Sequence, residues 1–437
     1  MRTFLLAVTF AGVVHAGELD LQEAIHLALE NNLEIKALKN EVKASELELK
    51  ASKGSYFPKI KVDEIFTRTD IPVYAFMTKL NQERIKLEDF NPTKLNNPSP
   101  LSNFETKLSI EIPLWLGGKL QAMEKVASHN LSAVKEDYER KKDEIIFKVY
   151  NAYMDAVLAK NAIKVSEQAV MDAKEHVKLA ESMQKVGTAL LSDVLRARVY
   201  LSKAEESLTS SKNNYGVSKK AIELITNTEL GDFDVSDIES CPAVDVEEIK
   251  RIALEKRQDI KALQERIKAM ESMYRAIISD NLPQIYAFGS YSLYSKSAPL
   301  GADGSGYMVG AGISWSFDTG LSTLKKAQSY LEIKRSLEEK LKLLKASVLF
   351  EIDKAYANYQ NALYSLKSAE DRIKESQEVL RVMELRYKAG LVRMVDLLDA
   401  QTELDKARLE KVQALNNCQK AYSDLLYSGG LIREVVK

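Results

Sequence analysis

Few residues of this 437-residue sequence are of types that could do chemistry. Its two cysteines and four histidines lie far apart along the chain, at spacings that fit neither a metal cluster nor a nucleophile with a neighbouring base. The sequence also lacks the glycine-rich loop that holds a phosphate. We therefore predict that the protein is not an enzyme and that it uses no metal and no other cofactor.

The two cysteines, Cys241 and Cys418, allow two interpretations. Neither lies near the predicted start of the mature chain, where a lipid anchor would be attached. In an oxidising compartment the pair could form a disulfide, but we expect two free, buried thiols. Mass spectrometry without reductant distinguishes these two states.

Acidic residues stand at two matched places in the chain, each shortly after a glycine. Gly187 precedes Ser192 and Asp193, and Gly390 precedes Asp396. A glycine in the left-handed conformation ends a helix at little cost, and an acidic residue in the first turn of the next helix stabilises its N-terminus. The pattern predicts a turn between two helices at each glycine, and helix capping accounts for Asp193.

The two glycines are equivalent positions of an internal duplication. The sequence from Asp20, DLQEAIHLALENNLEIKAL, aligns with that from Asp245, DVEEIKRIALEKRQDIKAL, at an offset of 225 residues. The match later resumes at an offset of 203, which pairs Gly187 with Gly390. The first copy therefore holds 22 extra residues, and the Pro- and Asn-rich stretch 90–100 predicts that they form an exposed loop.

Each copy is predicted to contain two short helices, two strands separated by a loop, one very long helix, the glycine turn and a last helix. The first 16 residues combine Arg2, an apolar run and Val14-His15-Ala16, which favours a secretory signal peptide over a buried helix. The predicted domains are a signal peptide (1–16), a first repeat (17–227, strands near 59–70 and 104–116), a linker (228–244) and a second repeat (245–437, strands near 284–296 and 307–318).

The long helices predict a bundle or a tube of side-by-side helices. Each spans about 68 residues and would reach on the order of 100 Å. In the second copy, apolar residues recur every three or four positions from Leu337 to Leu366, which marks a single apolar stripe. A helix of this kind buries its stripe only by lying along other helices.

The strands alternate between apolar and polar residues. From Phe104 the predicted apolar face continues to Leu116 and leaves Trp115 on the other face, and the run from Tyr307 to Phe317 alternates likewise. Strands of about ten residues with aromatic residues near their ends are typical of outer membrane proteins. After the signal peptide, no run reaches the ~18 apolar residues of a transmembrane helix.

A location in the membrane requires several chains to share one barrel. Four strands cannot close a barrel, and lipid tolerates no open sheet edge. The alternative is a secreted or periplasmic structural coiled-coil protein without channel activity. The net charge of -1, with 62 basic and 63 acidic residues interspersed, favours no nucleic-acid partner.

The sequences around the two glycines resemble the turn motif of TolC-type outer membrane efflux proteins, also called outer membrane factors. The two sequences are MQKVGTALLSDVLRARVYLSKAE (183–205) and RYKAGLVRMVDLLDAQTELDKAR (386–408). The predicted order of helices and strands is also similar to that of this family over nearly the whole mature chain. The resemblance implies a mixed α/β membrane protein, a homotrimer whose shared 12-stranded β-barrel stands on a long α-helical periplasmic barrel.

The same resemblance implies a function and partners. The chain would be the exit duct of a tripartite efflux pump or a type I secretion system in the outer membrane. It would work with a periplasmic adaptor protein and an inner-membrane transporter.

Asp399 is the acidic residue that capping does not explain. It lies one turn after Asp396 on the same helix face, where like charges repel, and its equivalent in the first copy is Arg196. In the family that the chain resembles, two aspartates at this place line the periplasmic aperture. We expect Asp396 and Asp399 to attract cations and to make the aperture sensitive to divalent block, with pKa values raised by mutual repulsion.

The family also closes this aperture with polar links from a tyrosine and an arginine to the acidic residue of the first copy. The resemblance places Tyr387 and Asp193, beside Ser192, in these roles. The arginine position holds Val392, and Arg393 follows one place later. Tyr387, Asp193, Ser192 and Arg393 are therefore the candidates for gating links, and the link from the arginine is expected to be shifted or absent.

Overall fold

The computed structural model describes residues 17–238 and 240–436, so the predicted signal peptide lies outside the described residues. The chain forms two compact units. The first contains residues 17–41, 135–262 and 341–436, and the second contains residues 42–134 and 263–340. Each unit takes segments from both copies of the duplication, and the boundaries of the repeats stay a prediction.

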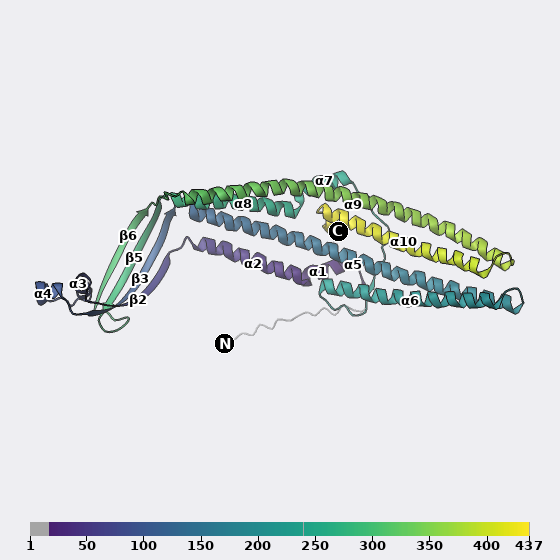
Figure 1. Ribbon diagram of the computed structural model, residues 1–437, viewed down its shortest axis with the longest axis horizontal. Helices are drawn as coiled ribbons and strands as arrows, with labels where there is room; N and C mark the ends of the chain where they lie inside the picture. The colour runs from purple at the N-terminus through teal and green to yellow at the C-terminus, as the bar shows by residue number, and fades with distance from the viewer. Residues whose placement is uncertain (1–16, 239, 437) are drawn as a thin grey trace. The chain divides into compact units, whose positions relative to one another are not determined.

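The first unit is mainly helical. Its elements are β1 (Glu18–Leu19), α1 (Leu21–Asn31), α6 (Leu191–Thr226), β4 (Asp234–Val235), α7 (Val246–Lys256), α10 (Met394–Ser428) and η3 (Ile432–Val436), with parts of α2 (Leu33–Gly54), α5 (Lys119–Lys185), α8 (Gln258–Ile278) and α9 (Ser322–Lys388). In Figure 1, α6 runs back along α5, and α10 runs back along α9. These two helical hairpins follow the predicted order of a long helix, a turn and a last helix.

Matched hydrogen bonds at two helix breaks reveal the duplication. Asn32 separates α1 from α2, and its side-chain amide donates to Ile225 O at 2.8 Å. The equivalent residue, Arg257, separates α7 from α8 and donates to Ser428 O, also at 2.8 Å. Ile225 and Ser428 are themselves equivalent residues near the ends of α6 and α10. Two different side chains thus anchor the same helix ends in the two copies.

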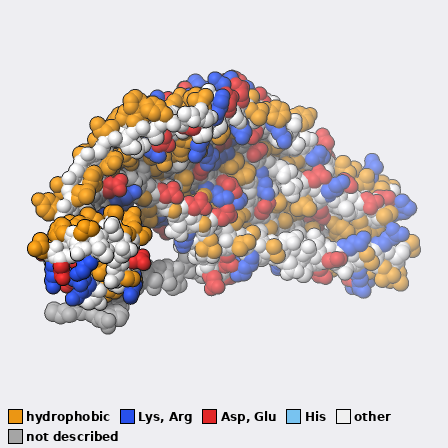
Figure 2. All heavy atoms as spheres, turned by 60° about the vertical axis from the view of Figure 1, so that its left-hand side comes forward, with side chains coloured by type: hydrophobic (Ala, Val, Ile, Leu, Met, Phe, Trp, Pro, Cys, Tyr) orange, Lys and Arg blue, Asp and Glu red, His pale blue; other side chains and the backbone are white. Residues whose placement is uncertain are grey.

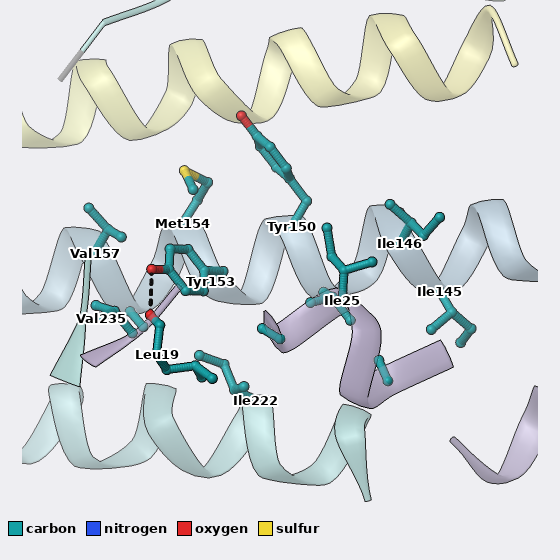
Figure 3. Packing of buried hydrophobic residues seen from close by; sticks show 14 of the residues in the cluster. Leu19, Ile25, Ile145, Ile146, Tyr150, Tyr153, Met154, Val157, Ile222 and Val235 are labelled. Carbon is teal, nitrogen blue, oxygen red and sulfur yellow. Dashed lines mark hydrogen bonds between the residues drawn. The ribbon is translucent and has the colours of Figure 1, made fainter. Parts of the chain in front are cut away.

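The core of the first unit surrounds Tyr153, which is 0% exposed. Its hydroxyl donates to Leu19 O at 2.8 Å and accepts from Ser236 N at 2.8 Å. Figure 3 shows Tyr153 among apolar side chains, including Leu19 and Ile25, that come from α1, α5, α6, β1 and β4. Ile432, in the last helical turn of the chain, is buried in the same cluster. Segments more than 400 residues apart in the sequence therefore share one core.

Cys241 and Cys418 form a disulfide, so the prediction of two free thiols is wrong. The bond joins the linker to α10 across 177 residues of sequence, with the Cα atoms 6.4 Å apart. A neighbouring hydrogen bond from the Tyr359 hydroxyl to Pro242 O holds the same part of the linker. The pairing carries no local sequence signal, because only the packed helices bring the two cysteines together.

The second unit contains an antiparallel sheet with the strand order β2-β3-β5-β6. The strands are β2 (Lys59–Thr69), β3 (Leu101–Leu116), β5 (Gln284–Ser295) and β6 (Gly304–Ser314). They lie side by side in Figure 1, where β2 and β6 form the two edges. Among the described residues, no helix combines the length and the apolar character needed to cross a membrane.

The extra residues of the first copy are exposed, as predicted, but they are partly helical. They contain α3 (Pro72–Asn81), η1 (Leu87–Phe90) and α4 (Pro92–Asn96), which lie at one end of the sheet in Figure 1. Proline fits the first position of α3 and α4 because no partner is needed there for a backbone amide, and Asn91 caps α4. Buried Gln82 ties the segment to β3 through Ser102 O and Asn103.

One face of the sheet is apolar, as the alternation predicts. Val62, Leu108, Tyr291 and Tyr307 form one row across the four strands. Figure 2 shows hydrophobic side chains gathered along the sheet, whereas charged side chains of both signs cover the helices. Val62 and Tyr307 are 67% and 81% exposed, so this face is suited to contact with lipid.

Two details of the predicted strands are wrong. A bulge between Pro113 and Trp115 shifts the register of β3, so Trp115, and not Leu116, joins the apolar face. The last strand ends at Ser314 rather than near 318. Ser314 pairs with Gln284, the first residue of β5, so the neighbouring strand offers no partner beyond this point.

Candidate functional site at the two helical turns

Both turn glycines end a long helix in the same way. Gly187 and Gly390 have φ angles of 82° and 72°, in the left-handed region that glycine adopts without strain. At the second turn the Gly390 amide donates to Tyr387 O and the Leu391 amide donates to Arg386 O, each at 2.9 Å. The first turn repeats this pattern at 3.0 and 2.9 Å. These paired bonds satisfy carbonyls that a helix end leaves free.

An aspartate caps the helix that follows each turn. Asp193 Oδ2 accepts a hydrogen bond from the Leu190 amide at 3.2 Å, and Asp396 Oδ2 accepts one from the Arg393 amide at 3.0 Å. Ser192, next to Asp193, is exposed. The capping role is therefore present in both copies and accounts for the shared position of the two carboxylates.

The charge around Asp396 differs from the prediction. The Arg393 guanidinium lies 3.2 Å from Asp396 Oδ1. Its hydrogen bond is the main cause of a lowered pKa at Asp396, so the predicted rise through repulsion from Asp399 is wrong for this residue. Asp399 is exposed and forms no ion pair among the described residues. Arg393 therefore forms its ion pair with Asp396, whereas Asp399 interacts with Arg393 only through a weaker Coulomb attraction, without a contact.

An apolar cluster formed by both hairpins supports the two turns. Tyr387 of α9 and Met394 and Leu397 of α10 are buried in it with residues of α5 and α6. Tyr387 is 3% exposed, and its hydroxyl has no hydrogen-bond partner among the described residues. Burial and, next, the charge of Asp193 raise the pKa of Tyr387. Tyr387 and Asp193 are therefore near each other without a hydrogen bond, and Val392 packs against the same cluster.

A buried polar network joins the two hairpins elsewhere along their length. Gln401 of α10 is 1% exposed, and its amide nitrogen donates to Asp172 of α5 at 3.1 Å and to Asp405 at 3.0 Å. Its side-chain oxygen lies 3.0 Å from His176 Nε2. Arg408 lies between the carboxylates, 3.0 Å from Asp172 and 3.3 Å from Asp405. Burial raises the pKa of Asp405 in spite of the hydrogen bonds that it accepts.

Sequence reasoning missed this network, although one signal is present. Gln401 interrupts the apolar stripe of α10 between Leu397 and Leu404, at helical spacing. A polar residue in such a stripe needs buried partners. Some of its partners lie on α5, more than 200 residues earlier, and spacing along α10 cannot identify them.

The turns offer charge and shape rather than catalytic groups. In the described part of the chain, no group of three or more histidine, cysteine or acidic residues could hold a metal ion. Asp399 instead has an exposed carboxylate near the start of α10, the helix that follows the turn at Gly390. Such a group can act on passing ions by its charge.

Sequence comparison identifies the family. A sequence model of the outer membrane efflux protein family matches residues 24–228 and 251–430. The toluene efflux pump outer membrane protein TtgF of Pseudomonas putida is 21% identical over 401 residues, which cover 89% of this chain and 78% of that protein. The outer membrane protein TolC of Vibrio cholerae is 27% identical over 139 residues, 31% of each chain.

Solved structures share the fold. The outer membrane protein VceC of Vibrio cholerae has a TM-score of 0.77 at 15% identity, covering 94% of this chain and 96% of that chain. The outer membrane channel CmeC of Campylobacter jejuni has a TM-score of 0.76 at 16% identity, covering 94% of this chain and 86% of that chain.

The chain belongs to the outer membrane efflux protein family. It is an outer membrane protein with a large periplasmic helical part, and it acts as an exit duct in efflux. The predicted family, the fold of long helices with a β-sheet portion, the outer membrane location and the role as an exit duct in efflux are thereby confirmed.

Proposed function

We propose that three copies of the chain form one duct. Four strands from each copy close a 12-stranded barrel. The helical turns surround the periplasmic aperture of the duct. The duct serves a tripartite efflux pump or a type I secretion system, in which a periplasmic adaptor couples it to an inner-membrane transporter. It needs no cofactor, catalyses no reaction and has no nucleic-acid partner.

An uncovered apolar stripe is the observation that carries this proposal. At the start of α10, Met394 and Leu398 are 0% and 7% exposed, because they pack between the two hairpins of one chain. Their equivalents at the start of α6, Leu191 and Leu195, are 58% and 51% exposed. A neighbouring copy that lays α9 along this stripe would repeat the contact that α10 makes with α5 inside the chain.

The edges of the sheet support the same assembly. β2 and β6 are each 11 residues long. Neither has a second neighbouring strand among the described residues, and lipid tolerates no unpaired backbone groups. If β6 of one copy pairs with β2 of the next, a closed ring of copies leaves no edge.

Leu195→Asp is expected to disrupt the trimer. Burial of a leucine side chain contributes about 1.5–3 kcal/mol, so each interface should weaken at least about tenfold. Light scattering of the detergent-solubilised protein on dilution measures the trimer fraction. Val199→Asp is the matched control, because Val199 is also exposed on α6, at 57%, and its equivalent in α10, Thr402, is exposed within the chain. A trimer that survives Leu195→Asp unchanged would refute the proposed interface.

Asp396 and Asp399 are proposed to line the aperture. Three copies place six carboxylates there, and a ring of this kind attracts cations and binds divalent ions. Because Arg393 pairs directly with Asp396, Asp399 is the carboxylate of the two that has no ion-pair partner in contact. The lowered pKa of Asp396 keeps this carboxylate ionised to a lower pH than a free aspartate.

Asp399→Ala is expected to lower the ratio of cation to anion permeability about threefold, since it removes from the aperture a carboxylate that has no ion-pair partner in contact. Arg393→Ala is expected to raise the ratio, because it releases the charge of Asp396. Single-channel recordings in planar bilayers, with and without divalent cations, measure both changes. Ser182→Ala is an uncharged control near the other turn, because Ser182 is exposed and its hydroxyl donates to Lys178 O of the same helix. If Asp399→Ala alters neither selectivity nor divalent block, the aperture does not lie at these residues.

For the closed state we propose a gating link from Tyr387 to Asp193. Ser192 and Arg393 lie nearby in the proposed assembly. The buried Tyr387 hydroxyl without a partner supports this role, since a small shift of either hairpin would give it one. The same recordings test Tyr387→Phe, for which more frequent opening is expected. Unchanged opening would exclude a link through this hydroxyl.

A further inference from the structure

The edge strand β6 carries several glycines on the polar face of the sheet. They are Gly304, Gly306, Gly310 and Gly312. Two aromatic residues of β5, Phe288 and Tyr286, pair with Gly310 and Gly312. A Cβ atom on Gly310 would lie 2.7 Å from Phe288 Cζ, and one on Gly312 would lie 2.7 Å from Tyr286 Cζ. Both rings therefore lean over bare glycine backbone.

The two rings form one aromatic surface. Their centroids are 6.2 Å apart, and their planes are inclined by 37°. Covering glycine backbone stabilises a strand, and this structural role accounts for the inner side of each ring. It does not account for the outer side, because Phe288 remains 36% exposed. An exposed aromatic face is available to a ligand.

An acidic side chain and a cavity adjoin these rings. Glu111 of β3 is the direct partner of Phe288 and lies on the same face of the sheet. It is exposed and forms no ion pair among the described residues. A cavity of about 710 Å³ is lined by residues that include Tyr286, Glu111 and Lys59. A volume of this size is in the range of small-molecule sites, ~300–1,000 Å³.

The charges around the cavity leave Glu111 available. Lys119, at the helical end of the cavity, is compensated by Asp280 at 2.8 Å. Lys59 lies opposite Glu111 in the sheet register, on the edge strand β2, and forms no ion pair with it. Glu111 is therefore the carboxylate beside the rings that can attract a cation.

We propose that Tyr286, Phe288 and Glu111 form a binding surface for planar aromatic cations. A flat ring stacks on an exposed aromatic side chain without demanding a particular hydrogen-bond pattern. The negative face of an aromatic ring also attracts a cation. Glu111 adds a Coulomb attraction that a neutral aromatic molecule does not experience. Each feature favours the same class of ligand.

This inference rests on the proposed function in one respect, namely that the polar face of the sheet lines the lumen of the duct. A site on the wall of a duct must release what it binds, so weak affinity is suitable. We expect a dissociation constant on the order of 0.1–1 mM. Binding is measured on the purified protein, independently of transport, selectivity and the trimer interface.

Ethidium, a planar aromatic cation, is the probe, and its fluorescence anisotropy measures binding to the detergent-solubilised full chain. Phe288→Leu keeps an apolar side chain over Gly310 but removes the aromatic face, so the dissociation constant should rise about tenfold. Glu111→Gln should raise it about threefold. Phenanthridine is the neutral parent ring system of ethidium. In competition experiments its dissociation constant should be at least about threefold higher than that of ethidium.

Tyr291→Leu is the matched control, because Tyr291 lies on the opposite face of β5 and is 47% exposed. Wild-type affinity in this control, together with weakened binding in Phe288→Leu, supports the site. Unchanged binding in Phe288→Leu overturns it, as does equal weakening in the control or equal affinity for phenanthridine. Circular dichroism of each variant verifies that the fold is retained.

Discussion

Reduction of the Cys241–Cys418 disulfide is expected to lower the free energy of unfolding by about 5 kcal/mol, as estimated from a loop of 177 residues. The bond excludes extended conformations of the unfolded chain, and this effect grows with loop length. It also holds the linker against α10 in the folded state. Its loss should therefore free the residues around Pro242, which the Tyr359 hydroxyl contacts.

Urea titrations of the detergent-solubilised protein, with and without dithiothreitol, measure this effect. Cys241→Ala, Cys418→Ala and the double variant should all lose the stabilisation from the bond, and the two variants that replace the fully buried Cys418 should lose more than Cys241→Ala because they also leave a small cavity. None of these variants should respond to the reductant. Mass spectrometry after alkylation without reductant gives a direct check, and modification of both cysteines in the native protein would contradict the pairing.

Tyr153→Ala is expected to destabilise the first unit by about 4 kcal/mol. The substitution leaves a cavity in the core and removes the hydroxyl that binds Leu19 O and Ser236 N. Tyr153→Phe removes only the hydrogen bonds and should cost about 1–3 kcal/mol. The urea midpoint and slope of each variant give these free energies.

The duplication supplies a control for this experiment. Tyr356 is the equivalent residue in the second copy, but it is only partly buried. Tyr356→Ala should therefore cost less than Tyr153→Ala. Equal losses at the two positions would show that burial in the monomer does not determine the cost.

The turns could be predicted from the sequence because their chemistry is local. Gly187 and Gly390 need a left-handed conformation, and the carboxylates of Asp193 and Asp396 accept hydrogen bonds from backbone amides only three residues away. Each feature is contained in a few adjacent residues. The duplication then places both features twice, which separates the pattern from coincidence.

Features that depend on distant contacts could not be predicted in this way. The partners of Gln401 on α5 and the pairing of Cys241 with Cys418 exist only after the helices pack. The prediction of a raised pKa at Asp396 is wrong for a different reason. Arg393 lies only three residues from Asp396, and its guanidinium, rather than the charge of Asp399, determines the direction of the pKa shift.

The strands were predicted with their boundaries only partly right. Alternation identifies a strand whose faces meet different surroundings, but it does not reveal a bulge such as the one between Pro113 and Trp115. It also does not reveal where a neighbouring strand begins, which determines that β6 ends at Ser314. Both errors concern pairing, which is a property of two segments rather than one.

The position of Ile432 constrains the order in which the core of the first unit can form. Leu19 and Ile25 share this core with Ile432, which lies more than 400 residues later in the sequence. A ribosome makes residues 19 and 25 long before residue 432, so their apolar side chains stay incompletely covered until the segment around Ile432 has been synthesised. Closure of this core is therefore a late step in folding, whatever the order in which the helical hairpins form.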